Sequence, residues 1–129
     1  MAFVVIALGA WTRLVDAGLG CPDWPGCYGF VFWPNDEVEI ALAESRFPMF
    51  PYDINKAIPE QVHRLFAAAL GLVAILLVYL SFSRTDDKSI KRWSLFLLIL
   101  ICCQGLFGYL TVSLNLLPII VTTHLFGGF

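Results

Sequence analysis

The chain contains only two histidines, His63 and His124, and each lies near one end of a long apolar stretch. Two imidazoles that approach from opposite sides suit a haem, because its iron takes histidine nitrogens on either face. Proline is favoured at the first helical position, so we expect Pro59 and Pro118 to begin the helices that carry the histidines. At about 1.5 Å per residue, the rings then lie roughly 6 Å and 9 Å from the helix starts. This nearly common depth favours one shared ligand over two unrelated polar residues near helix ends.

Two charged residues accompany His63 on the same predicted helix. Glu60 precedes it by three residues, which places the two side chains on one helical face, one turn apart. A carboxylate beside a haem can relay protons or stabilise positive charge on a substrate, whereas an ordinary acid at a helix start interacts with the helix dipole. Arg64 suits either a haem propionate or the lipid headgroups. Both pairs of alternatives remain open from the residues alone.

The four cysteines fall into two pairs of different character. Cys21 and Cys27 lie in GLGCPDWPGCYG, whose glycines and prolines indicate a chain that turns back on itself. In an oxidising compartment we expect them to form a disulfide, and a metal pair is less favoured because no further His or Cys lies at ligand spacing. Cys102 and Cys103 lie inside an apolar stretch, where cysteine behaves as a small hydrophobic residue.

The composition predicts a membrane protein. Hydrophobic residues make up 59% of the 129 residues and charged residues only 14%, against about a quarter in soluble domains. Residues 65–83 and 93–113 carry no charge and are long enough to cross a bilayer, which takes about 20 residues. The apolar runs at the two ends are shorter, and we interpret them as truncated crossing helices. A signal peptide is less favoured for the first run, because no charge precedes Arg13.

We therefore expect an all-α fold, an integral membrane four-helix bundle whose first and fourth helices are truncated. The short connection RTDDKSIKR is dense in Lys and Arg, which places it on the cytoplasmic side and the long acidic connection outside. Within the long connection, residues 35–55 show no motif, and we interpret them as variable loop. The predicted segments are the helices 1–12, 59–83, 93–113 and 117–129, the outer loop 13–58 with the cysteine pair, and the cytoplasmic loop 84–92.

Three segments carry a resemblance to a known family. They are GAWTRLVDAGLGCPDWPGCYG (9–29), PEQVHR (59–64) and QGLFGYLTVSLNLLPIIVTTHLFGG (104–128). In this order they closely resemble the N-terminal half of bacterial haem A synthase. The second segment is weak by itself, whereas the first and third are long and specific, and the resemblance runs across nearly the whole chain.

The resemblance implies a fold, an activity and roles for individual residues. Members of the family are eight-helix membrane proteins built from two four-helix bundles, each with a histidine pair. They oxidise the C8 methyl group of haem O to a formyl group, and a haem b cofactor serves electron transfer. His63 and His124 match one pair of axial ligands, Glu60 matches the catalytic glutamate, and Cys21 and Cys27 match the outer-loop cysteine pair. We expect the pair to hold the substrate haem; the reverse assignment, with haem b at this pair, stays open.

The resemblance also implies a setting in the cell. We expect a multi-pass protein of the bacterial inner membrane with the Cys21–Cys27 loop on the periplasmic side. The expected partners are haem O and haem A, haem O synthase, the assembly of cytochrome oxidase and membrane lipid, and a homo-oligomer stays open. Nothing in the sequence indicates nucleic acid binding.

Three other functions fit some of the residues. A membrane b-type cytochrome needs the two histidines but not Glu60. A membrane thiol oxidoreductase would use Cys21 and Cys27, and a non-catalytic assembly subunit would use neither set.

Two axial histidines leave no open position on the haem iron, which disfavours direct insertion of oxygen. A synthase reaction in which Glu60 stabilises an oxidised ring edge and water supplies the oxygen fits these residues better.

Overall fold

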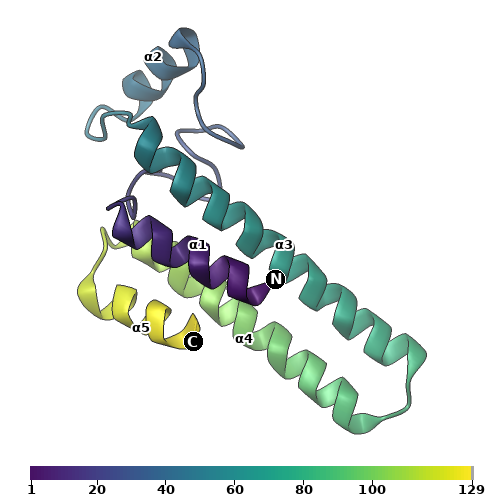
Figure 1. Cartoon of the computed structure of the whole chain (residues 1–129). Coiled ribbons are helices and arrows are strands. Elements are labelled where there is room, and N and C mark those ends of the chain that lie inside the picture. Colours follow the sequence, from purple (N-terminus) through teal and green to yellow (C-terminus); the bar gives the residue numbers. More distant parts are fainter. Residues whose placement is uncertain (129) are drawn as a thin grey trace.

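The computed structural model describes residues 1–128, and these residues form helices and no strand, as predicted. Phe129, the last residue of the predicted segment 117–129, lies outside the described residues. The helices are α1 (Ala2–Leu14), α2 (Glu37–Arg46), α3 (Ile54–Arg84), α4 (Lys88–Ser113) and α5 (Pro118–Gly128) (Figure 1).

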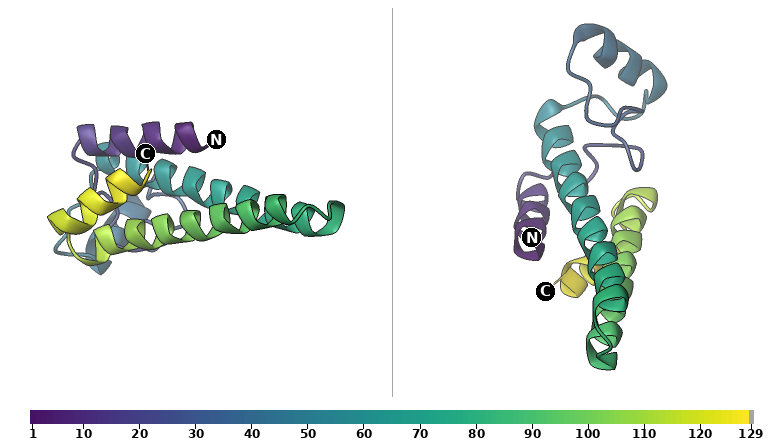
Figure 2. Two further views of the ribbon diagram at one scale, coloured as in Figure 1. Left: turned by 90° about the horizontal axis from the view of Figure 1, so that it is seen from below. Right: turned by 90° about the vertical axis from the view of Figure 1, so that its right-hand side faces the viewer.

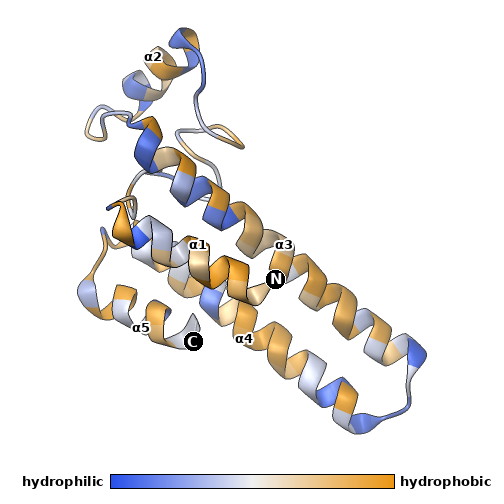
Figure 3. Ribbon diagram, viewed as in Figure 1, coloured by the Kyte–Doolittle hydropathy of each residue, from blue (hydrophilic) through white to orange (hydrophobic). Residues whose placement is uncertain are grey.

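The helices α3 and α4 form a long antiparallel hairpin that organises the chain (Figure 1). Both are long and apolar enough to cross a membrane. Only 11% of the apolar stretch of α3 and 6% of that of α4 are buried within the chain. Most of their apolar side chains are therefore exposed, as expected of helices that lipid surrounds. Figure 3 shows that hydrophobic residues predominate along the hairpin.

The two shorter apolar helices lie along the hairpin on one half of its length. α1 packs against α3, and α5 packs against α4. Both lie near the end where the long connection emerges, and among the described residues no helix covers the half that ends at the α3–α4 turn (Figures 1 and 2). The four apolar helices thus come together only at the end that we predict to face outward.

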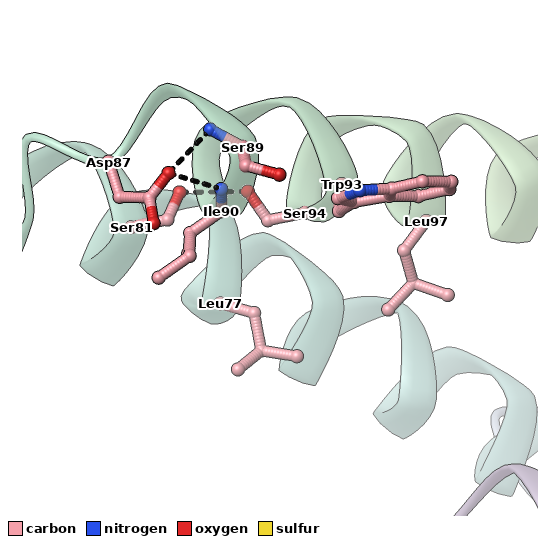
Figure 4. A pocket seen from close by; sticks show the side chains of 8 residues that line it. All are labelled: Leu77, Ser81, Asp87, Ser89, Ile90, Trp93, Ser94 and Leu97. Carbon is pink, nitrogen blue, oxygen red and sulfur yellow. Dashed lines mark hydrogen bonds between the residues drawn. The ribbon is translucent and has the colours of Figure 1, made fainter.

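The α3–α4 turn is tighter than the predicted cytoplasmic loop 84–92, since α4 begins at Lys88. The side chain of Asp87 caps α4 by accepting hydrogen bonds from the backbone of Ser89 at 2.7 Å and Ile90 at 3.4 Å. Below the turn, the hydroxyl groups of Ser81 and Ser94 lie 2.8 Å apart and join the two helices (Figure 4).

A shallow hollow of about 410 Å³ lies at this turn, between Leu77 of α3 and Trp93 of α4 (Figure 4). Ser81, which also lines it, is 18 residues after His63, or about 27 Å along the helix axis. The hollow is therefore not the histidine site.

α3 begins at Ile54, so the prediction that Pro59 opens this helix is wrong. Asp53 supplies the start signal, because its side chain accepts a hydrogen bond from the backbone of Asn55 at 2.9 Å. Pro59 lies inside the helix and has no N–H for the carbonyl of Asn55. Asn55 lies in the exposed first turn, where water can satisfy that carbonyl. Proline is consequently tolerated at this position.

The outer segment 35–55 is not a featureless loop, because it contains α2. The side chain of Asp36 accepts from the backbone of Glu39 at 2.8 Å, and the side chain of Glu39 accepts from the backbone of Asn35 at 3.0 Å. The bond to Asp36 satisfies a donor that a helix start otherwise leaves free, and the bond from Asn35 holds the residue before the cap. The two acidic residues, three apart, are the sequence signal that our interpretation missed.

The main buried cluster lies in the outer segment and not between the apolar helices. It is formed by Cys21, Cys27, Tyr28, Ala43 and Ala57, with aromatic side chains packed around it. The hydroxyl of Tyr28 donates to the carbonyl of Pro51 at 3.2 Å. Burial, and then the neighbouring Tyr52, raises the pKa of Tyr28 to about 12. The long connection is therefore a small folded unit with its own core.

Candidate functional site

His63 lies in α3 on the side that faces α1, where it packs over Gly9. A Cβ placed on Gly9 would lie 2.9 Å from Cε1 of His63, closer than real Cβ atoms come. An alanine at position 9 would therefore require the imidazole to move from this place.

His124 has a matching arrangement against the other helix of the hairpin. It lies in α5 and packs over Gly108 of α4, where an added Cβ would lie 3.5 Å from Cε1 of His124. The sequence draws attention to Gly108 because it belongs to a glycine-rich stretch, but Gly9 gives no such signal. Gly105, by contrast, faces open space, with nothing within 4 Å of an added Cβ. Each histidine thus lies against a glycine of the neighbouring helix.

The two imidazoles share a second property. Nδ1 of His63 and Nδ1 of His124 are both buried, and neither has a hydrogen-bond partner among residues 1–128. The rings lie on α3 and α5, and both of these helices pack against α4. Since buried polar atoms in proteins are normally hydrogen-bonded, these two nitrogens are candidate positions for binding a ligand.

The expected equal depth was derived from two helix starts, of which only one was wrong: α5 begins at Pro118 as predicted, whereas α3 begins before Pro59. His63 is the tenth residue of α3, because this helix extends beyond Pro59 into the outer segment. His124 is the seventh residue of α5. The extra residues of α3 lie beside the folded outer unit, so the distances of the two histidines from their helix starts differ.

The side chains around the histidines fit haem better than a metal ion held by protein ligands alone. In the part of the chain that the structure describes, no group of three or more His, Cys, Asp or Glu side chains could hold a metal ion. A two-histidine site is too small for zinc, which needs at least three protein ligands. Haem brings its own ring nitrogens and needs only axial ligands from the protein, so two imidazoles suffice.

Glu60 lies on the side of α3 that faces the cysteine loop, and it is only 5% exposed. One carboxylate oxygen accepts from the guanidinium of Arg64, the next turn of the helix. The other accepts from the backbone N–H of Cys21 at 2.9 Å. Glu60 thus lies three residues before His63 on α3, and both of its carboxylate oxygens bind other groups of the protein.

Arg64 binds the cysteine loop, a contact that the sequence did not predict. One terminal nitrogen donates to the carbonyls of Asp23 and Gly26, both at 2.7 Å. The other donates to the carbonyl of Cys21 at 3.2 Å and to Glu60. These contacts occupy both terminal nitrogens, which leaves little of the guanidinium for a propionate.

The loop that Arg64 binds is closed by a disulfide between Cys21 and Cys27, with an S–S distance of 2.05 Å. Both cysteines are fully buried. Gln61 adds a further contact, because its amide nitrogen donates to the carbonyl of Val31 beyond the loop. Cys102 and Cys103 are free and exposed on the hairpin, in keeping with their apolar surroundings in the sequence.

A protein family and several related proteins match this chain over most or all of its length. The family COX15-CtaA, described as cytochrome oxidase assembly protein, matches residues 1–129. The chain belongs to this family. A heme A synthase of Shewanella oneidensis is 45% identical over 126 residues, which is 98% of this chain and 38% of that protein. A heme A synthase of a Chelativorans species is 31% identical over 88% of this chain and 35% of its own length.

A third relative is the heme A synthase of Anaplasma marginale, 26% identical over 96% of this chain and 40% of its own length. The chain thus spans well under half the length of these curated relatives. No solved structure matches the chain. The membrane helices predicted from the sequence fit a family of membrane proteins.

Proposed function

We propose that this chain forms the haem-binding outer half-site of a haem A synthase, an oxidoreductase that converts haem O into haem A. The main support is the 45% identity to a heme A synthase across 98% of the chain. The geometry adds two imidazoles whose buried Nδ1 atoms have no hydrogen-bond partner among residues 1–128, each ring packed over a glycine. His63 and His124 would hold the haem from opposite faces, as axial ligands of its iron.

The reaction turns the C8 methyl group of haem O into a formyl group. With water as the oxygen source, it releases four electrons and four protons, so an acceptor and a proton path are needed. Haem b supplies the electron transfer when it is bound. We propose that the pair in this chain holds the substrate haem, because Glu60, the candidate catalytic group, lies on the same helix as His63.

Glu60 is proposed as the catalytic residue, stabilising positive charge at the oxidised methyl carbon. Its burial supports this role, because a carboxylate acts more strongly on a nearby charge when water is excluded. Its contacts with Arg64 and Cys21 fix its position without a contribution from the substrate. The charge would therefore be in place before the reaction begins.

The test is the identity of the pigment made by the protein in membranes that supply haem O. The synthase should yield haem A, whereas a b-type cytochrome would yield haem b alone. Glu60→Gln keeps an oxygen that can accept from Cys21 but loses the anion, so it should retain haem and form at least about tenfold less haem A. Haem A at the wild-type yield would show that Glu60 is not catalytic.

A thiol oxidoreductase gains no support from the geometry. Working thiols must be reachable by their substrates, and both Cys21 and Cys27 are fully buried beneath the outer segment. We propose instead that the disulfide is structural and that its loop faces the periplasm, with the protein in the bacterial inner membrane. The basic residues at the α3–α4 turn then lie on the cytoplasmic side. The proposed partners are haem O synthase and the cytochrome oxidase that receives haem A.

A further inference from the structure

The guanidinium of Arg64 is the main attachment of the disulfide loop to α3. It binds the carbonyls of Cys21, Asp23 and Gly26, so its contacts are distributed along the loop from one cysteine nearly to the other. Its fourth partner is Glu60, which in turn accepts from the backbone of Cys21. A planar guanidinium presents its donors in a fixed fork and can hold several acceptors at once, whereas a lysine ammonium is a single point.

The same loop also contacts α3 through an uncharged, close approach of its backbone at Gly20. An added Cβ at Gly20 would collide with the backbone carbonyl of Lys56 in the first turn of α3. Because a backbone atom cannot move aside as a flexible side chain can, only glycine allows the loop to lie this close. The loop is therefore attached to α3 by two separate features: the hydrogen bonds of Arg64 and the close backbone contact at Gly20.

The loop also reaches the other side of the bundle. The ring of Trp24 packs edge-on against Tyr109 of α4, with ring centroids 5.7 Å apart. Just before the loop, an added Cβ at Gly18 would lie 3.1 Å from the side chain of Leu116, which belongs to the connection between α4 and α5. Tyr109 directly follows Gly108, the residue under His124. The loop thus bridges the helix of His63 and the helices that place His124.

We propose that Arg64 is a positioning residue: it fastens the Cys21–Cys27 loop to α3, and through this loop it fixes how the two histidine-bearing sides of the bundle meet. Its part in haem binding is then indirect, because its terminal nitrogens bind the protein and not a propionate. The effect on the histidines rests on the function proposed above. The attachment of the loop does not, and it can be measured without haem.

The first measurement is the rate at which a water-soluble phosphine reduces the Cys21–Cys27 disulfide in the membrane protein. Cys102→Ala and Cys103→Ala provide the background, so that only the outer pair yields thiols. Because hydrogen bonds to a charged group are lost, Arg64→Gln should speed reduction at least about tenfold, and Arg64→Lys should only partly restore the slow rate. Gly20→Ala should speed reduction although Arg64 is intact.

The matched control is Lys56→Met. Lys56 also joins α3 to the N-terminal part of the outer segment, through a 3.3 Å ion pair with Asp16, but its side chain is 41% exposed and that of Asp16 80%. An exposed pair contributes little, so this variant should be reduced at the wild-type rate. Reduction of Arg64→Gln at the wild-type rate would overturn the proposal.

The second measurement is the absorption spectrum of the haem bound to the same variants. Arg64→Gln and Gly20→Ala should shift it in the same direction, and the double variant should add little, because both act through the loop. A shift in Arg64→Gln without one in a Gly20→Ala protein that has a fast-reducing disulfide would mean direct haem contact and would also overturn the proposal. Absence of haem from the wild-type protein would contradict the proposed function, while the reduction rates would still decide the role of Arg64 in holding the loop.

Discussion

Gly9 of α1 and His63 of α3 fit together so closely that a single added methyl group would come within 2.9 Å of the imidazole. The contact fixes the ring from the side of α1, while Nδ1 of the same ring is left without a hydrogen-bond partner in the described residues. α1 therefore shapes the site although it contributes no ligand. In the proposed haem site, α1 contributes the space that Gly9 leaves for the imidazole.

Gly9→Ala should displace His63 and lower the haem content of the purified protein by about tenfold, because the new methyl group overpacks a fitted site. Gly108→Ala should have a smaller effect, since its Cβ would make an ordinary contact of 3.5 Å with His124. The haem-to-protein ratio measures both. Gly71→Ala, where the added Cβ has nothing within 4 Å, is the control for the general effect of alanine in these helices. Equal haem content in all three variants would refute the fitted role of Gly9.

The phenol of Tyr28 should titrate late. Burial raises its pKa from 10 to about 12, so the folded outer segment favours the neutral phenol. The stabilisation from this group is complete below pH 10 and is lost as the pH rises through about 12. The tyrosinate absorbance of the wild type, after subtraction of that of Tyr28→Phe, should therefore have its midpoint near pH 12. A midpoint near the ordinary value of 10 would mean that Tyr28 is not buried as described.

Asp36→Ala should loosen α2. The carboxylate of Asp36 caps the helix by accepting from the backbone of Glu39, and loss of such a cap costs about 1 kcal/mol. Hydrogen exchange of amides in Glu37–Arg46 should speed up, while exchange in α3 stays the same. Unchanged exchange in α2 would show that other contacts, and not the cap, hold this helix.

Much of this architecture could be predicted from the sequence, because α3 and α4 each contain a long stretch without charge, at residues 65–83 and 93–113. The predictions failed where a polar side chain caps a helix at a position that the apolar pattern does not indicate. Pro59 resembles a helix start, but Asp53 caps the helix earlier, and the carbonyl left free by the proline lies in the exposed first turn. α2 was missed because its capping pair of Asp36 and Glu39 lies in a segment without apolar periodicity.

The site was only partly predictable for a related reason. The two histidines stand out because the chain has no others, and Glu60 stands out by its spacing from His63. The contacts of Arg64 join residues about forty positions apart, from α3 to the cysteine loop, so no local pattern reveals them. The sequence around Gly9 does not reveal its role either, because that role depends on which side chain of the neighbouring helix packs against the glycine.

His63 and His124 are proposed to hold the same haem, and electron paramagnetic resonance of the oxidised protein in membranes can measure this. We expect His63→Ala and His124→Ala each to lose the same low-spin signal of a haem with two histidine ligands, and the double variant to lose no more than either. If the double variant loses twice the signal of each single variant, or a single variant keeps the signal, the two histidines do not hold the same haem.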